Sequence, residues 1–294
     1  MNLFLSQLIN GLQIGSIYAL VALGYTMVYG IVKLLNFAHG DIIMVGGYIA
    51  LFSLTAFYFS PVVAAILTVL GCVLLAVIIE KLAYKPLRNA PRLSLLITAI
   101  GISILLQNLA QLAFGANGRG FPAQQMMPAG SVQFVGLSIS YVALITIVVS
   151  VISMAGLTIL VQKSKLGKAM RAVSEDMGAS QLMGINVNHI ITFTFAVGAA
   201  LAGIGALMYS VQMPMIMPTI GALLGLRAFV AAVLGGIGSI PGTMIGGYVI
   251  GIIEAMAAWQ GFNSWVDAIV FLILIIVLLV RPAGIMGRNM MEKV

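Results

Sequence analysis

The chain has 294 residues, of which 62% are hydrophobic and only 7% are charged, and its mean hydropathy is +1.15. Soluble proteins carry about 25% charged residues, so this composition excludes an ordinary soluble domain and predicts a protein that crosses the membrane several times. The net charge of +7 does not indicate nucleic-acid binding, because the basic residues lie in short loops between apolar runs, where they set orientation.

Seven apolar runs approach the length of about 20 residues that a membrane helix needs. A further region, residues 220–259, has enough apolar residues for two helices but is broken in the middle by GGIGSIPG, residues 235–242. The sequence therefore predicts one all-α domain over residues 1–294, a polytopic bundle of about 8–9 membrane helices that includes a glycine-rich broken pair. The seven runs cover residues 8–31, 40–59, 62–82, 93–114, 138–161, 190–211 and 263–280.

Lysine and arginine residues indicate the orientation of this bundle, since cytoplasmic loops are enriched in them. Basic residues follow the first, third, fifth and last runs, whereas Arg119 is the one basic residue in a loop at the opposite end. The N-terminus is therefore expected outside and the C-terminus in the cytoplasm. The region 220–259 must then enter and leave on the same side, either as two short spans or as a re-entrant pair of half-helices.

One polar interruption, residues 162–189, separates the fifth and sixth runs. Met170, Val173 and Met177 fall at helical spacing between its charged residues, which predicts a short amphipathic helix that ends near Gly184. Such a helix between two membrane spans is suited to docking a partner. The alternative is a solvated loop whose basic residues only fix the topology, and composition alone favours this alternative.

A second polar segment, residues 115–137, follows the fourth run and contains GANGRGFPAQQMMPAG. Its glycine and proline content predicts an irregular loop. In the predicted orientation this loop lies outside, where it is long enough to contact a partner, although a simple connection is the default interpretation.

Polar side chains inside the apolar runs are candidates for function, because an ionised group at mid-membrane costs at least about 2.5 kcal/mol. Asn36, His39 and Asp41 lie in NFAHGD at the start of the second run. They either cap a helix at the cytoplasmic boundary or, if the helix is broken at Gly40, face the interior and line a pathway. Gln107, deep in the fourth run, is expected to form an inter-helix hydrogen bond.

Arg227 and Glu254 lie in the two halves of the broken region and are expected to form an ion pair inside the membrane. A structural role for this pair is favoured over contact with a substrate. Tyr25, on the first predicted helix, either lines a pore or packs against its neighbours.

No motif for covalent or metal-assisted chemistry occurs in the sequence: HExxH, GxSxG and a zinc-type His/Cys cluster are all absent. The phosphate loop GxxxxGK[ST] is also absent, because Ala169 follows Gly167 and Lys168 and the leading glycine is missing. We therefore expect no catalytic residue, no metal site and no ATPase activity on this chain. If ATP drives it, another subunit hydrolyses the ATP.

Several segments resemble the permeases of branched-chain amino acid ABC importers, and the similarity extends over essentially the whole chain. It is closest to the first of the two permeases that such systems pair. Met177, Gly178 and Ser180 depart from the more alanine-rich stretch of many family members. The segments that carry the resemblance are GYTMVYGIVKLLNFAHGD (24–41), SEDMGASQLMGINV (174–187), LRAFVAAVLGGIGSIPGTMIGGYVIGIIEA (226–255) and LLVRPAGIMGR (278–288).

The resemblance implies a multi-pass subunit of the bacterial inner membrane that moves leucine, isoleucine or valine by alternating access. It implies a solute-binding protein outside, a second and usually non-identical permease subunit, and two cytoplasmic ATPase subunits that hold ATP and magnesium. This chain would carry no cofactor of its own.

The resemblance also gives the central loop a role, as the coupling element that docks on the ATPase. Its candidate coupling positions are Gly167, Arg171, Glu175, Asp176, Gly184 and Ile185. The candidate substrate pathway consists of Tyr25, Asn36, His39, Asp41 and Gln107.

Two alternatives stay open at this point. An ABC permease for another small solute, such as a sugar, urea or an amide, is separated from the main interpretation by resemblance alone. A secondary transporter driven by an ion gradient would use Arg227 and Glu254 as ion or proton sites. We identify no further acidic residue in the apolar runs, and this disfavours the secondary transporter.

Overall fold

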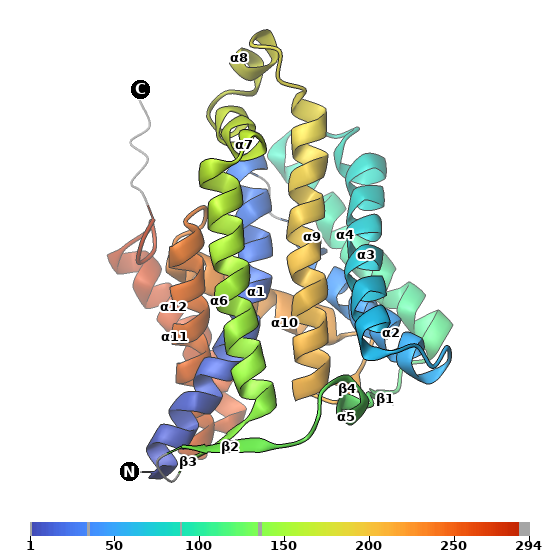
Figure 1. Cartoon of the computed structure of the whole chain (residues 1–294). Coiled ribbons are helices and arrows are strands. Elements are labelled where there is room, and N and C mark those ends of the chain that lie inside the picture. Colours follow the sequence, from blue (N-terminus) through green and yellow to red (C-terminus); the bar gives the residue numbers. More distant parts are fainter. Residues whose placement is uncertain (1, 34–35, 89, 135–136, 288–294) are drawn as a thin grey trace.

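The computed structural model describes residues 2–33, 36–88, 90–134 and 137–287. These residues form a bundle of helices with four short strands gathered at the end of the bundle where the N-terminus lies (Figure 1). The architecture is the polytopic helical bundle that the composition predicts.

Seven helical segments in the described residues are long and apolar enough to cross a membrane. Together with two shorter apolar helices, α2 (His39–Thr55) and α10 (Ile220–Gly235), they make nine apolar helices, at the upper end of the predicted number. The seven segments correspond to α1 (Asn2–Val32), α3 (Pro61–Ile79), α4 (Arg92–Phe114), α6 (Tyr141–Lys163), α9 (Val187–Gln212), α11 (Ile240–Trp259) and α12 (Val266–Val280). The segment of α3 continues through the π-helical turn Glu80–Tyr84, and that of α12 begins with the 3₁₀ turn Asn263–Trp265.

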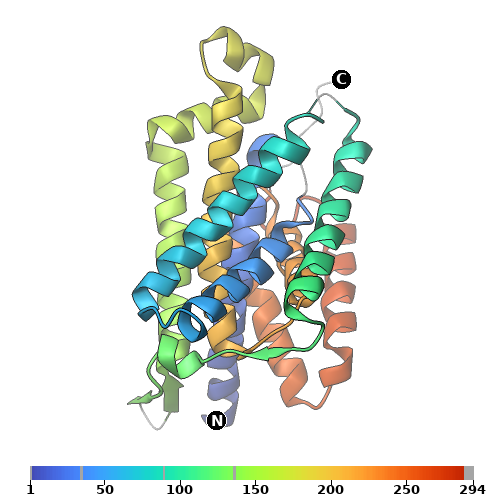
Figure 2. The same ribbon diagram turned by 90° about the vertical axis from the view of Figure 1, so that its right-hand side faces the viewer.

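Helix α1 forms the centre of the bundle and packs against α6, α9, α10 and α11. Its contact with α11 is close enough for the backbones to touch: a Cβ on Gly15 would lie 2.7 Å from the Cα of Tyr248. Small residues allow this approach where no water is present to drive association. Helix α3 crosses the bundle at a slant and packs on α2 and α9 (Figure 2).

Helix α2 begins deep inside the bundle and not at its end. His39, its first residue, lies against Gly24 of α1, about two helical turns before α1 ends at Val32. The segment therefore lies in the interior, as one of its two interpretations predicts, and a role in lining a pathway stays a prediction. The residue before α2, Ala38, makes no side-chain cap, and the break comes just before Gly40 and not at it.

The broken region folds as two antiparallel helices joined by a glycine-rich turn. Helix α10 ends at Gly235, and Gly236 and Gly238 have φ angles of +103° and +96°, which glycine adopts without strain. The 16 residues of α10 span about 24 Å, which is less than the hydrocarbon thickness of about 30 Å. The chain after α12 returns to this turn, where the amides of Ile285 and Met286 donate to the carbonyls of Leu234 and Gly235 at 2.9 and 3.0 Å.

The segment 115–137 is more ordered than an irregular loop. It contains strand β1 (Arg119–Gly120), helix α5 (Ala123–Met126) and strand β2 (Ser131–Phe134). β1 pairs antiparallel with β4 (Met215–Ile216), and β2 pairs with β3 (Leu137–Ser140). The predicted start of the fifth span at residue 138 is therefore wrong, since β3 extends to Ser140, which caps α6 by accepting from the amide of Ala143 at 3.1 Å.

Candidate functional site

The start of α2 brings polar residues from three helices together inside the bundle. Asn36, His39 and Asp41 are buried, and Gln107 of α4 donates to Asp41 Oδ1 at 3.0 Å. The rings of Tyr25 on α1 and His39 lie edge to face with their centroids 4.8 Å apart. We call these five residues the interior cluster.

Two polar atoms of the interior cluster are buried without a hydrogen-bond partner among the described residues. In the part of the chain that the structure describes, His39 Nε2 and Asp41 Oδ2 have no hydrogen-bond partner. Asp41 lies in the first turn of α2, where the helix dipole stabilises a negative charge. The cluster therefore combines one carboxylate with neutral polar side chains in the interior of the bundle.

Sequence reasoning missed two polar neighbours of this cluster. The hydroxyl of Tyr84 donates to Asn36 Oδ1 at 2.7 Å, and Ser103 accepts from Gln107 at 3.1 Å. Ser103 and Gln107 are four residues apart on one helix, and this spacing was a signal that they share a face. The amide of Asn108, by contrast, bonds the Ile104 carbonyl of its own helix.

The predicted coupling element, residues 162–189, forms two helices and not the single helix predicted; we call it the coupling segment after this predicted role. Helix α7 (Lys165–Glu175) ends at Asp176, whose side chain accepts from the amide of Ala179 at 2.9 Å and so starts helix α8 (Met177–Leu182). The predicted apolar face is divided accordingly. Met170 and Val173 are buried, whereas Met177 lies on α8 and is 40% exposed.

Two of the candidate coupling residues fasten α7 to the end of α6. Gly167 packs so closely that a Cβ would overlap the carbonyls of Leu160 and Val161. The Arg171 guanidinium donates to the same Val161 carbonyl. These contacts set the angle at which the coupling segment leaves the bundle.

The remaining candidate positions lie at the outer part of this segment. Glu175 and Asp176 are exposed, and Gly184, with φ of +81°, ends the turn after α8. Ile185 is half-buried, just before Asn186 caps α9 by accepting from the amide of His189 at 3.1 Å. Asn186 was not among the predicted site residues.

Helix α8 carries large apolar side chains on an exposed tip. It lies at the extreme end of the molecule, beyond the helices of the bundle (Figure 1). Leu182 is 90% exposed and Met183 is 82% exposed. Exposed apolar side chains that gather at one projecting point are typical of an interaction surface.

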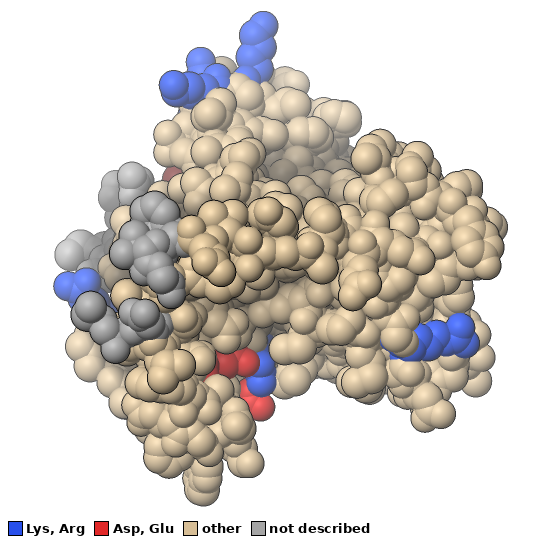
Figure 3. Space-filling view, turned by 60° about the horizontal axis from the view of Figure 1, so that its bottom comes forward, with Lys and Arg blue, Asp and Glu red and all other residues tan. Residues whose placement is uncertain are grey.

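Arg227 and Glu254 lie 2.7 Å apart, in a network that is larger than the predicted pair. The Tyr18 hydroxyl donates to Glu254 Oε2 at 2.6 Å, and Arg227 also contacts Asp267 of α12 at 2.8 Å. Figure 3, which brings the lower end of the molecule in Figure 1 forward, shows acidic side chains beside a basic one in a hollow of the surface. The network connects α1, α10, α11 and α12, as a structural role requires.

The statement that the apolar runs hold no further acidic residue is wrong. Glu80 lies at the end of the third run and is fully buried, and Asp267 lies in the last run. Both are paired with an arginine, Glu80 with Arg88 and Asp267 with Arg227. Within the described residues, no group of three or more His, Cys, Asp or Glu could hold a metal ion.

Comparisons with known proteins agree over nearly the whole length. Residues 7–279 match the family model for the permease component of branched-chain amino acid transport systems. The chain is 44% identical to the high-affinity branched-chain amino acid transport system permease protein BraD of Pseudomonas aeruginosa, with 99% of this chain and 98% of that protein covered.

Two further relatives are less similar to the chain. The permease protein LivH of Escherichia coli strain K12, which carries the same description, is 41% identical at the same coverage. The ribose import permease protein RbsC of Haemophilus influenzae is 26% identical, with 92% of this chain and 83% of that protein covered. No solved structure matches the chain.

Proposed function

The chain belongs to the family of branched-chain amino acid transport permeases, and we propose that it works as the membrane-spanning permease subunit of an ATP-driven importer for leucine, isoleucine and valine. It carries no catalytic residue and no cofactor of its own. Two separate cytoplasmic ATPase subunits hold ATP and magnesium and hydrolyse the ATP. A solute-binding protein delivers the amino acid outside, and a second, non-identical permease subunit completes the pathway.

The observation that carries this proposal is the exposed apolar tip of the coupling segment. Leu182 and Met183 are exposed at the end of α8, and the carboxylates of Glu175 and Asp176 are exposed at its start. The four basic residues Lys163, Lys165, Lys168 and Arg171 precede them in the chain, which favours a cytoplasmic position. An apolar tip in water is stabilised by a partner that covers it, and the ATPase is that partner.

The interior cluster is the proposed contact point for the substrate. A branched-chain amino acid has an apolar side chain between an ammonium and a carboxylate. Asp41 supplies a negative charge for the ammonium, and the amino ends of α2 and α10, which begin against each other at Gly40 and Gly221, favour the carboxylate. Alternating access then exposes this point first to the outside and next to the cytoplasm.

Motion of the ATPase subunits reaches the bundle through α7 and α8. ATP binding closes the two ATPases, and the closure moves the coupling segment that rests on them. Because Gly167 and Arg171 hold α7 against the end of α6, a displacement of the tip is transmitted to the membrane helices as a rigid movement.

Affinity purification of the tagged chain from its native membrane tests this function, with mass spectrometry of the proteins that accompany it. We expect a stoichiometric ATPase with a phosphate loop, and ATP-dependent leucine uptake when the complex and its binding protein are reconstituted in liposomes. The double variant E175Q/D176N should retain the ATPase but lose coupled uptake. A chain that purifies alone and carries ion-driven flux, or a complex that imports ribose and not leucine, would overturn the proposal.

A further inference from the structure

The buried carboxylate of Glu80 begins an irregular turn at the end of α3. Residues Glu80–Tyr84 form a π-helix, closed by a hydrogen bond of 2.8 Å from the amide of Lys85 to the Glu80 carbonyl. Single π-turns are rare and occur often at functional sites. Nothing in the proposed function uses this turn, although it lies between the coupling segment and the interior cluster.

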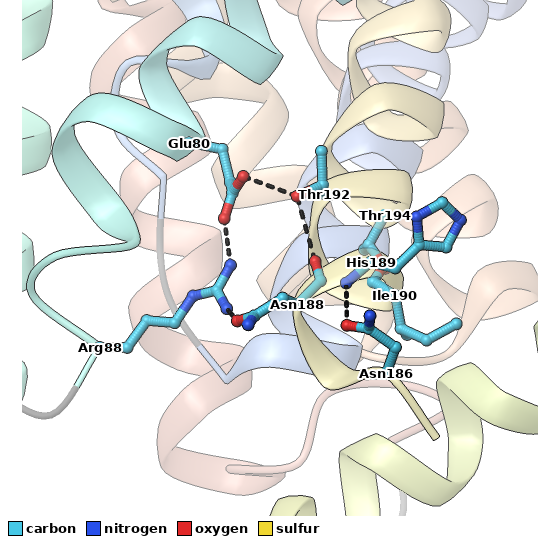
Figure 4. A network of polar contacts seen from close by, with 8 residues as sticks. All are labelled: Glu80, Arg88, Asn186, Asn188, His189, Ile190, Thr192 and Thr194. Atoms are coloured by element: carbon cyan, nitrogen blue, oxygen red, sulfur yellow. Dashed lines mark hydrogen bonds and ion pairs between the residues drawn. The ribbon is translucent and has the colours of Figure 1, made fainter. Parts of the chain in front are cut away.

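On one side, the π-helical turn is tied to the first turns of α9, where the coupling segment ends. Arg88 pairs with Glu80 Oε1 and also donates to the side chain of Asn188 (Figure 4). The Thr192 hydroxyl donates to the other oxygen, Glu80 Oε2, at 2.8 Å. Both carboxylate oxygens of Glu80 are therefore bonded: one to Thr192, which belongs to α9, and the other to Arg88, which is itself bonded to Asn188 of α9.

On the other side, the same turn reaches the interior cluster. Its last residue, Tyr84, is buried, and its hydroxyl donates to Asn36 Oδ1 at 2.7 Å, three residues before α2 begins. The Tyr84 ring packs against Phe195 of α9 with ring centroids 5.5 Å apart. A continuous set of contacts thus leads from α9 through Glu80 and Tyr84 to the start of α2.

We propose that the π-helical turn Glu80–Tyr84 is the element that couples movement of the ATPase-docking segment to the substrate pathway, with Glu80 and Tyr84 as its two positioning residues. This inference rests on the proposed function. When the coupling segment moves, the start of α9 moves with it, and Thr192 and Asn188 displace Glu80 and Arg88. The turn then shifts Tyr84 and, through Asn36, the start of α2.

A cavity beside the π-helical turn leaves space for its side chains to move. A cavity of about 70 Å³ is lined by Tyr84 and Arg88 of this region, by Phe195 of α9 and by Met177 of α8. The cavity therefore connects the turn with the coupling segment itself. A π-turn holds one extra residue relative to the α-helix, so the turn can convert to α-helix or shift along the helix by whole residues. Coupling requires an element with two discrete arrangements, and such a turn has them.

The buried carboxylate of Glu80 ties the π-helical turn firmly to the start of α9. A carboxylate without water is stabilised only while its partners stay in place, so Glu80 resists separation from Arg88 and Thr192. The ion pair therefore moves as a unit with the start of α9. A neutral residue at position 80 would allow α9 to slide past the turn without moving it.

The test compares two threonines in the whole transporter, reconstituted with its ATPase, partner permease and binding protein. Thr192→Val removes the hydroxyl that joins α9 to Glu80 but leaves the Glu80–Arg88 pair intact. Thr98→Val is the matched control, because the Thr98 hydroxyl bonds only the Ser94 carbonyl of its own helix among the contacts described. The readout is the number of leucine molecules imported per ATP hydrolysed.

We expect Thr192→Val and Tyr84→Phe each to lower leucine import per ATP by about 3-fold or more, with Thr98→Val unchanged. Because both variants interrupt one chain of contacts, the double variant should import no less leucine per ATP than the more impaired of the two single variants. Glu80→Gln should show the same uncoupling. If it reduces the amount of complex, Thr192→Val decides the test.

A transporter in which Thr192→Val and Tyr84→Phe import leucine at the wild-type ratio would overturn this inference, and so would effects of the two that multiply in the double variant. Failure of the proposed function looks different. In that case the wild-type complex itself shows no ATP-dependent leucine uptake, and no ratio exists to compare.

Discussion

The backbones of Gly40 and Gly221 lie in direct contact, so that a Cβ on either residue would overlap the peptide group of the other. Gly40 is in the first turn of α2 and Gly221 in the first turn of α10, and the two short helices therefore begin at one point inside the bundle. Broken helices whose amino ends meet in the interior are typical of transporter binding sites. The proposed substrate site depends on this contact.

Gly40→Ala should disrupt that point of contact. The added Cβ would lie 2.9 Å from the Cα of Gly225, and backbone cannot give way as a flexible side chain can. Overpacking of this kind costs about 1–3 kcal/mol, and we expect loss of leucine uptake together with a lower unfolding temperature in detergent. Gly101→Ala in α4 is the control, since a Cβ there meets nothing within 4 Å. Equal behaviour of the two variants would contradict the contact.

The Arg227 network predicts a difference between its two acids. Glu254→Gln should lower the unfolding temperature clearly, because Glu254 is mostly buried and breaking a buried ion pair costs about 3–5 kcal/mol. Asp267→Asn should have a small effect, since the Asp267 side chain is 50% exposed and such pairs contribute about 0–1 kcal/mol. Thermal unfolding of both purified variants checks this, and a larger shift for Asp267→Asn would show that α12 depends on the pair more than α11 does.

The amide of Gln107 should matter for transport, whereas that of its neighbour should not. Gln107→Leu removes the donor to Asp41 Oδ1, and hydrogen bonds to charged groups contribute about 1.5–3 kcal/mol, so we expect KM for leucine to rise roughly tenfold or more. Asn108→Leu is the matched control, because that side chain bonds its own helix. Uptake kinetics in liposomes measure both. Unchanged KM in Gln107→Leu would place the substrate elsewhere.

The joint between α6 and α7 gives a test of how the coupling segment is held. Gly167→Ala should force α7 away from the end of α6, since the new Cβ would lie 2.6 Å from the Val161 carbonyl carbon. We expect reduced retention of the ATPase on purification and reduced uptake. Gly156→Ala, in α6 with open space around it, should leave both unchanged. Normal ATPase retention by Gly167→Ala would mean that the tip docks regardless of its angle.

Much of the helical bundle was predictable, because long apolar runs separated by basic loops leave few other structures possible in a membrane. The proximity of Arg227 and Glu254 was predictable for a similar reason, since each charge in an apolar segment requires a partner. Their third partner, Asp267, was missed because it lies at the start of its run, where an acid is easily assigned to the loop.

The wrong predictions share a physical cause: the local sequence does not show how deeply a residue is buried in the folded bundle. Glu80 lies next to Lys81 at the edge of an apolar run, and only the fold reveals that it is fully buried. The start of α2 depends on the contact between Gly40 and Gly221, which are far apart in the sequence. The division of the coupling segment at Asp176 reflects a side chain that competes with the helix for a backbone amide, and this choice depends on the surrounding contacts.

The hydrogen bonds from Ile285 and Met286 to the end of α10 have a consequence for biosynthesis. Leu234 and Gly235 leave the ribosome well before the residues whose amides will satisfy their carbonyls. Until residues 285–286 have been made, the carbonyls of Leu234 and Gly235 lack these partners, and a buried carbonyl without a partner is costly. Helix α10 therefore reaches its final position only after α12 has been inserted.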